Sequence, residues 1–252
     1  MLFLVGIGLS DGDITLKAQE VCSSCELFVE RYTSTADDSR IKFMEGLFCR
    51  SIKQLGRSDM EENAKTLLEL ARNRDVAVLI GGDPLIATTH KTLFIEAKKR
   101  GIEVRIVHAA SIASAAIGES GLDFYRFGKV CTIPEWHEHY TPVSFYETIR
   151  LNMQNNEHSL VLLDYDPLTE SSMPLADVVK ELRAAEEAYK SGVVTDAMML
   201  VVLNRLSQQQ EFKTFVKFGE LEKLNINKGP TVMIIPAKLT GIEEEALNSM
   251  YK

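Results

Sequence analysis

The chain has 252 residues, of which 45% are hydrophobic and 25% charged, and its formal net charge is −8. This length and composition are typical of a soluble globular protein with one large α/β unit or two modest domains. The negative charge argues against a nucleic acid held mainly through its phosphates, and no apolar run approaches the roughly 18 residues of a membrane-spanning helix. Met1 leads straight into a predicted strand with no room for a signal peptide, so we expect a cytoplasmic protein.

The first glycine turn follows a strand predicted from LFLVG at the start of the chain. Gly6 and Gly8 form a G-x-G pair, but Asp11 occupies the place of the third glycine of a dinucleotide-binding loop, so this signal alone is weak. Leu9 comes directly after the turn. We expect Asp13 to cap the helix that follows.

The stretch VAVLIGGDPLIATTH at residues 76–90 carries the strongest local signal. Its apolar start predicts a strand buried on both faces, as in a parallel sheet. Gly81 and Gly82 end that strand, and their lack of a Cβ lets the backbone turn sharply and approach a ligand. Asp83 is the one charge at the carboxyl end of the strand. Because ligands of open α/β sheets bind just outside these ends, we favour a ligand site here over an ordinary turn.

A further strand is predicted from IEVRIVH at residues 102–108. Strands and helices alternate up to this point, and that order predicts a doubly wound α/β sheet. Ser111 and Ile112 then lie at the same sheet edge as Asp83. His108 ends the strand, and we interpret a lone histidine there as structural more often than catalytic.

Two patterns resemble metal or redox motifs. Cys22 and Cys25 form C-x-x-C, but no second pair completes a zinc site, so we interpret both as reduced packing residues. His137 and His139 alternate as if on one side of a strand, yet no third ligand follows at a recognised spacing. We therefore predict no metal site.

The second half of the chain repeats the α/β rhythm with fewer glycines, and no internal repeat of fixed period is present. We expect an N-terminal α/β domain at residues 1–112, with the G-x-G loop and the GGDP turn, and a C-terminal α/β domain at residues 113–252. In the second domain we predict helices over 144–155 and 174–190 and strands within 159–166, 196–206 and 231–240.

Several motifs, in one order across almost the whole length, resemble the diphthine synthase (diphthine methyltransferase) family, a branch of the tetrapyrrole methylases. The combination of GDPLIATTH with ASI and YRFG is specific to this branch, whereas the glycine loop is shared with other tetrapyrrole methylases. The motifs are LVGIGLSDGDITLKA, LIGGDPLIATTH, VHAASI, GLDFYRFGK, SFYETI, LVLLD and GPTVMIIPAKL.

The resemblance implies two unequal α/β domains with S-adenosyl-L-methionine in the cleft between them, S-adenosyl-L-homocysteine as product, and a homodimer. It also implies a protein substrate, elongation factor 2, whose modified histidine carries a 3-amino-3-carboxypropyl group that receives methyl groups on its amine. Carried onto matching positions, the implied cofactor contacts are Leu9, Asp83, Ile86, Ser111, Ile112, Leu163, Leu206 and Thr231.

Alternative functions are a tetrapyrrole, corrin-precursor or ribosomal RNA methyltransferase of the same fold, and a non-catalytic protein that binds an adenosyl ligand. Methyl transfer needs a neutral amine, but the sequence names no obvious base, and our hypothesis is that none is dedicated. A second hypothesis concerns Tyr125, Trp136 and Tyr146, whose aromatic faces would attract the partly methylated amine. Ordinary core packing is the alternative for these three residues.

Overall fold

The computed structural model describes residues 1–31, 36–56, 59, 64–167, 169–226 and 228–251. The chain divides into two compact units, Met1–Ile112 (unit 1) and Ala113–Lys252 (unit 2). Both contain a five-stranded sheet with helices packed against it. The predicted α/β class is therefore confirmed.

Unit 1 contains a parallel sheet in the order β3-β2-β4-β1-β5. β4 is the middle strand, and β1 lies between β4 and β5. The carboxyl ends of β1, β4 and β5 are therefore neighbours at one edge of the sheet. The strands are β1 (Leu2–Gly6), β2 (Glu26–Glu30), β3 (Ile52–Leu55), β4 (Val76–Ile80) and β5 (Val104–Val107).

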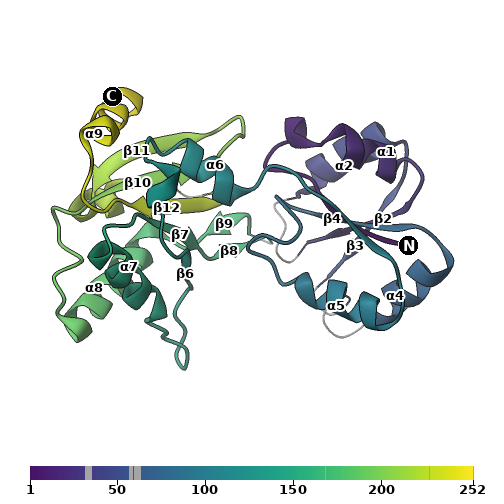
Figure 1. Ribbon diagram of the computed structural model, residues 1–252, viewed down its shortest axis with the longest axis horizontal. Coiled ribbons are helices and arrows are strands. Elements are labelled where there is room, and N and C mark those ends of the chain that lie inside the picture. Colours follow the sequence, from purple (N-terminus) through teal and green to yellow (C-terminus); the bar gives the residue numbers. More distant parts are fainter. Residues whose placement is uncertain (32–35, 57–58, 60–63, 168, 227, 252) are drawn as a thin grey trace. The chain divides into compact units, whose positions relative to one another are not determined.

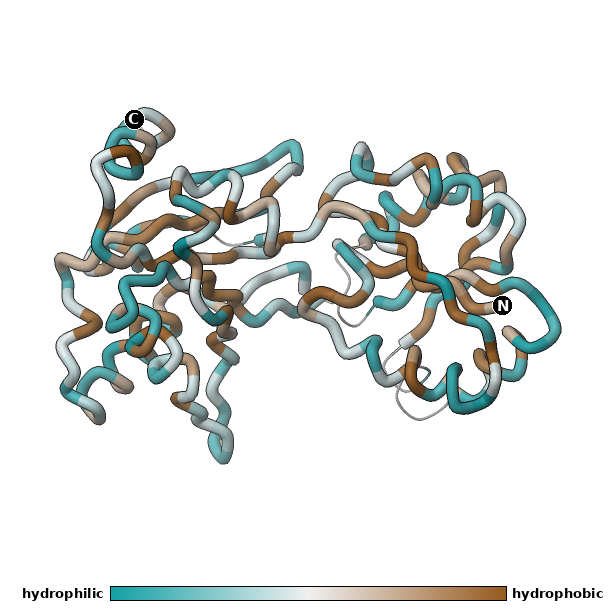
Figure 2. The backbone as a smooth tube through the Cα atoms, in the orientation of Figure 1, coloured by the Kyte–Doolittle hydropathy of each residue, from teal (hydrophilic) through white to brown (hydrophobic). Residues whose placement is uncertain are grey.

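Helices on both faces of the unit 1 sheet explain the unbroken apolar run in β4, whose residues are all buried. One face packs against α1 and α2 and the other against α4 and α5 (Figure 1). Hydrophobic residues concentrate along these strands, while the outer helices carry many hydrophilic ones (Figure 2). The helices are α1 (Leu16–Cys22), α2 (Asp38–Phe48), α4 (Ala64–Asn73) and α5 (Lys91–Lys99).

The start of α1 differs from the prediction. Thr15, and not Asp13, is the N-cap, because the Thr15 hydroxyl accepts a hydrogen bond from the N–H of Ala18 at 3.1 Å. The error arose because both residues precede the helix and both types are good caps. The Asp13 carboxylate instead accepts hydrogen bonds from main-chain N–H groups of the preceding loop.

Unit 2 contains a mixed sheet in the order β11-β10-β12-β7-β6. β12 runs antiparallel to both neighbours, β10 and β7, whereas β6 and β7 are parallel. A separate antiparallel pair, β8 with β9, follows β7. The strands are β6 (Cys131–Ile133), β7 (Ser159–Leu163), β8 (Tyr165–Asp166), β9 (Ser171–Ser172), β10 (Met199–Asn204), β11 (Phe212–Lys217) and β12 (Thr231–Ile235).

The core of unit 2 lies between its sheet and two helices, α7 and α8, which pack on one face. The C-terminal helix α9 lies on the other side of the sheet (Figure 1). The predicted helices over 144–155 and 174–190 are thus present, within a residue at each end. The helices are α6 (Ile112–Gly118), α7 (Ser144–Gln154), α8 (Leu175–Tyr189) and α9 (Gly241–Met250).

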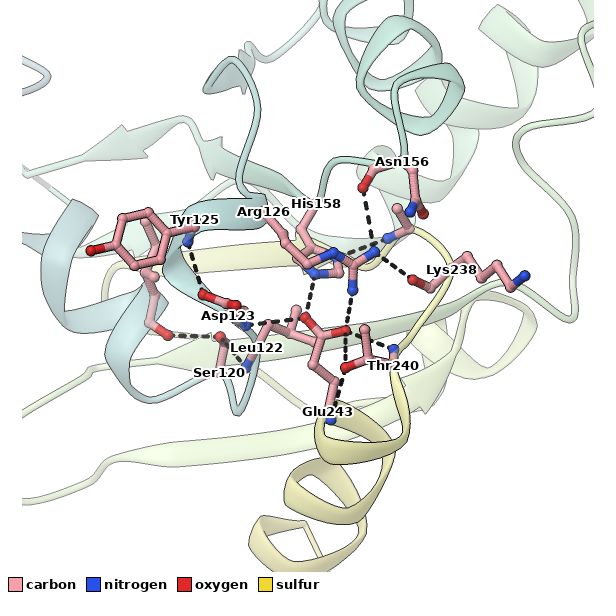
Figure 3. A network of polar contacts seen from close by, with 12 residues as sticks. Ser120, Leu122, Asp123, Tyr125, Arg126, Asn156, His158, Lys238, Thr240 and Glu243 are labelled. Carbon is pink, nitrogen blue, oxygen red and sulfur yellow. Dashed lines mark hydrogen bonds and ion pairs between the residues drawn. The ribbon is translucent and has the colours of Figure 1, made fainter.

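A buried polar network fixes the start of α9 to the rest of unit 2 (Figure 3). The Glu243 carboxylate accepts hydrogen bonds from Nε2 of His158 at 2.8 Å and from the N–H of Asp123 at 3.1 Å, and it also pairs with Arg126. Burial alone would raise the pKa of Glu243, but hydrogen bonds from the amides of Thr240 and Asp123 and from His158 outweigh it and lower the pKa to about 2.

The C-x-x-C pair is consistent with packing residues. Cys22 and Cys25 are both buried and unbridged, and burial raises the pKa of the Cys22 thiol to about 12. His137 and His139 do not share a strand face, since the main chain turns between His137 and Tyr140, whose N–H and C=O groups pair in both directions. Within the described ranges there is no group of side chains that could hold a metal ion, and no helix long and apolar enough to cross a bilayer.

Candidate cofactor-binding site

The turns that follow β1 and β4 in unit 1 are hydrogen-bonded to each other. The N–H of Gly8 donates to the carbonyl of Gly82 at 3.2 Å, and the N–H of Gly82 donates back to Gly8 at 3.0 Å. Both residues have positive φ, +70° and +67°, which strains any residue with a side chain. A Cβ on Gly6 would lie 2.6 Å from the Gly82 oxygen. The glycines of two separate motifs therefore build one backbone bridge.

The loop that carries Leu9 is held from two sides. On the amide side, Oδ2 of Asp13 accepts from the N–H of Leu9 at 3.0 Å and from that of Ser10 at 2.8 Å. On the carbonyl side lies the buried guanidinium of Arg40, which comes from α2. The loop is therefore fixed before any ligand binds. The Arg40 Nη2 donates to the carbonyls of Ile7, Gly8 and Ser10 at 2.6, 3.2 and 2.9 Å.

Asp83 lies at the end of β4 with both carboxylate oxygens engaged. Oδ1 accepts from the N–H of Leu85 at 3.2 Å, and Oδ2 lies 2.7 Å from Nδ1 of His108, just after β5. The Asp83 side chain is only 8% exposed, whereas that of His108 is 70% exposed. The carboxylate is thus oriented by two neighbouring segments of the same sheet edge.

Two apolar residues and one hydroxyl complete this edge of unit 1. Ile86 follows Asp83, and its N–H bonds the Asp83 carbonyl at 3.3 Å while the residue is 46% exposed. Ser111 is buried after β5, and Ile112 begins α6. Together with Leu9, the predicted contacts of unit 1 therefore gather at the carboxyl ends of three adjacent strands.

The predicted contacts of unit 2 also share one sheet edge. Leu163 ends β7, and Leu206 follows the end of β10. Thr231 begins β12. Since β12 is antiparallel to both neighbours, its start nevertheless lies beside their ends, as the Asn204–Thr231 and Leu162–Val232 pairs show.

An asparagine organises this edge of unit 2. The buried amide of Asn204 donates to the Thr231 hydroxyl at 2.9 Å and to the Lys228 carbonyl at 3.0 Å. The N–H of Thr231 in turn donates to the Ser172 hydroxyl at 2.8 Å. These bonds hold Lys228 and Thr231 in place at the start of β12.

The chemistry of these residues fits an adenosyl ligand with a cationic sulfonium. Such a ligand needs apolar surface and a few placed polar groups more than it needs charges. The unit 1 edge offers the exposed side chain of Ile86, the oriented carboxylate of Asp83, and a fixed loop at Leu9. A carboxylate opposes the ligand's positive charge and accepts from an amino or hydroxyl group.

The aromatic residues expected to face the substrate do not form one wall. Tyr146 is fully buried, and its hydroxyl donates to Glu186 at 2.7 Å. Trp136 packs against the core of unit 2. Tyr125 alone of the three is highly exposed, at 90%. Core packing is therefore correct for Tyr146, because an amphipathic helix turns this residue inward.

Sequence reasoning missed one residue and did not foresee the partner of another. Arg40 lies in a polar stretch with no motif, so nothing marked its contacts with the glycine loop. His108 was noticed but interpreted as structural, because its partner Asp83 lies 25 positions earlier in the chain. Only the pairing of β4 and β5 with β1 brings the two together.

Comparison with known proteins agrees with this fold. Residues 1–220 match the family of Tetrapyrrole (Corrin/Porphyrin) Methylases. The chain is 36% identical to the diphthine synthase of Methanothermobacter thermautotrophicus over 249 residues, which cover 98% of this chain and 94% of the relative. The diphthine synthase of Methanocaldococcus jannaschii is also 36% identical, over 98% of this chain and 97% of its own.

Solved structures give the same result. A candidate diphthine synthase from Entamoeba histolytica superposes with a TM-score of 0.89 at 32% identity, covering all of this chain and 98% of the other. A further diphthine synthase crystal structure gives 0.86 at 34% identity, covering all of this chain and 96% of the other. The chain therefore belongs to the tetrapyrrole methylase family and, within it, to the diphthine synthase family. It is a methyltransferase.

Proposed function

We propose that this enzyme transfers methyl groups from S-adenosyl-L-methionine to the amine of the 3-amino-3-carboxypropyl group on a histidine of elongation factor 2. The observation that carries the proposal is the oriented carboxylate of Asp83 beside the Gly8–Gly82 bridge. This constellation, in a member of the diphthine synthase family, supplies one anion and an ordered backbone where a sulfonium ligand would bind.

The cofactor contacts that we propose are the residues that the family resemblance implies. In unit 1, Asp83 faces the cationic part or accepts from the amino group or ribose, while Leu9, Ile86, Ser111 and Ile112 provide backbone groups and apolar surface. In unit 2, Leu163 and Leu206 provide apolar surface and Thr231 a hydroxyl.

The reaction is an in-line displacement, so the chain acts mainly by orientation. The amine nitrogen, the methyl carbon and the sulfur must be aligned, and a fixed geometry contributes a large effective concentration. The clamp that Asp13 and Arg40 form on the Leu9 loop serves this alignment, because it removes loop motion that a substrate would otherwise have to arrest.

We further propose that the enzyme acts as a homodimer in the cytoplasm, with elongation factor 2 as its macromolecular partner. The net charge of −8 favours a protein substrate over a polyanionic RNA. It equally disfavours an anionic macrocycle as acceptor.

Mass spectrometry tests the acceptor. Elongation factor 2 that carries the unmethylated intermediate is incubated with the enzyme and S-adenosyl-L-methionine, and we expect added methyl groups on the modified histidine. Their number distinguishes three transfers from a fourth on the carboxylate. If the protein stays unmodified while a corrin precursor or ribosomal RNA is methylated, the acceptor proposal is wrong.

Calorimetric titration tests the cofactor site. Asp83→Asn should weaken binding of S-adenosyl-L-homocysteine by about 10-fold, the loss of roughly one charged hydrogen bond. Asp75→Asn is a matched control, because Asp75 precedes β4 at the opposite end and pairs with the terminal amine of Met1. Equal affinities for the two variants would contradict a role for Asp83.

A further inference from the structure

The Asp83–His108 pair has a geometry suited to moving protons. Oδ2 of Asp83 lies 2.7 Å from Nδ1 of His108. A carboxylate only accepts, so Nδ1 carries a hydrogen, and in the neutral imidazole Nε2 keeps its lone pair. The His108 side chain is 70% exposed, which leaves Nε2 open to a ligand or to solvent.

The other charged groups of the Leu9 loop are paired, since Oδ1 of Asp11 lies 3.4 Å from Nε of Arg40. Asp13 is committed to the amides of the Leu9 loop, and Arg40 is a cation that has no proton acceptor. His90 is buried, and burial lowers the pKa of its imidazole to about 4. Among the described residues, Asp83 is the charged group that contacts His108.

We propose that His108 is the general base of methyl transfer and that Asp83 orients it. This proposal rests on the proposed function, whose acceptor is an amine that is largely protonated near neutral pH. Nε2 of His108 takes a proton from the ammonium group, and the electron pair of the broken N–H bond stays on the nitrogen. That pair then forms the N–CH3 bond as the CH3–S bond breaks, and the sulfur keeps the latter pair as a neutral thioether.

Repeated transfer requires the base to be regenerated. Each added methyl group is accompanied by the loss of one proton, so three transfers release three. An exposed imidazole passes each proton to water between transfers, whereas a buried base would retain it. The exposure of His108 thus matches a reaction in which the same nitrogen is methylated more than once. With His108 as the base, methyl transfer has a dedicated proton acceptor, in place of our hypothesis from the sequence that it has none.

Single-turnover rates of the first transfer at two pH values test the proposal. General base catalysis contributes about 10²-fold at the low end of its usual range, so we expect His108→Asn to slow transfer by roughly that factor at pH 7. At pH 9.5, where the amine loses its proton without help, the loss should shrink to less than about 5-fold. Binding of S-adenosyl-L-homocysteine should stay within about twofold of the unsubstituted enzyme.

Chemical rescue separates a base from a structural residue. In His108→Ala, added imidazole should restore a large part of the rate at pH 7, because the position is open to solvent. Arg105→Gln is the matched control, since Arg105 is exposed on β5 and pairs with Glu103 away from this edge. We expect it to transfer at the full rate at both pH values.

Three outcomes would overturn the proposal. Full-rate transfer by His108→Asn at pH 7 would do so, as would an equal loss at both pH values without rescue by imidazole. So would a loss confined to cofactor affinity, since His108 would then only orient Asp83. If the unsubstituted enzyme binds cofactor but transfers no methyl group to the acceptor, the proposed function fails as well, and that result is distinct from failure of a variant alone.

Discussion

Among the described residues, each unit of this enzyme contains a histidine–carboxylate pair, His108–Asp83 and His158–Glu243, and these two pairs differ in burial. In unit 2, His158 is fully buried against Glu243, and both ring nitrogens are hydrogen-bonded, since Nδ1 accepts from the N–H of Ala237 at 3.0 Å. In unit 1, His108 bonds Asp83 through Nδ1 alone and remains exposed. The buried pair is an anchor for α9, whereas the exposed pair keeps a nitrogen available for chemistry.

The two histidines carry their proton on opposite ring nitrogens, because their hydrogen-bond partners differ. Nδ1 of His158 accepts a hydrogen bond, so its proton is on Nε2 and is donated to Glu243. Nδ1 of His108 donates, so its proton is fixed there. Residue types alone therefore do not reveal the role of a pair. The second partner of the imidazole, main chain or solvent, decides it.

The largest effect that we expect is from breaking the buried pair. Glu243→Ala leaves Arg126 and His158 without their buried anion, and removal of one partner of such a pair typically costs about 3–5 kcal/mol. Denaturant unfolding measures the loss. Glu245→Ala, exposed on the same helix, should change stability by less than about 0.5 kcal/mol. Equal stabilities would show that the network does not anchor α9.

Arg40 extends the comparison, because it is buried like Glu243 and His158 but lies beside the candidate site. Arg40→Met leaves several carbonyls of the glycine loop without their donor, so we expect a loss of about 2 kcal/mol in unfolding free energy and weaker binding of S-adenosyl-L-homocysteine. Lys42→Met, exposed on the same helix, is the control. If Arg40→Met were destabilised but bound the cofactor normally, the hydrogen bonds of Arg40 to the glycine loop would not be needed for cofactor binding.

Acid should weaken the buried pair. The pKa values of Glu243 and His158 are both lowered in the folded chain, that of His158 chiefly by burial. The unfolded chain therefore binds more protons, and the stability contributed above the unfolded pKa values is lost as the pH falls. We expect a decline that begins below about pH 6.5 and continues toward pH 2, on the order of 2 kcal/mol. Glu243→Ala should flatten the lower part of this curve.

The smallest effect should come from the exposed pair. His108→Asn removes one hydrogen bond from a mostly exposed side chain, so unfolding free energy should change by less than about 0.5 kcal/mol. His158→Asn, in contrast, should destabilise measurably by the same denaturant assay. If both variants lost similar stability, the structural role that we assign to His158 would also apply to His108.

Much of the fold followed from local patterns. The apolar run of β4 and the glycines after it predicted a buried parallel strand, and the alternation of elements predicted the α/β class. The antiparallel orientation of β12 could not be predicted from its sequence, because an apolar run such as TVMII occurs in buried parallel and antiparallel strands alike. Strand direction depends on which neighbours the strand pairs with, and this is a property of the whole sheet.

The candidate site was predictable only where motif and position coincide. Asp83 stands out because it directly follows two glycines at a strand end. Arg40 has no such context, and its contacts depend on how α2 packs over β1. Tyr146 misled because aromatic residues near a substrate and aromatic residues in a core look identical in sequence. Contacts between distant segments therefore account for most of what sequence reasoning missed.

The Gly8–Gly82 bridge ties together two turns that lie more than seventy positions apart in the chain. Because each glycine both gives and receives a hydrogen bond, neither turn can shift without carrying the other with it. An incoming ligand consequently meets a surface whose main chain is already assembled, and little ordering entropy is lost on contact. The lengths of the two turns are therefore coupled, because a residue inserted into one turn would displace the other.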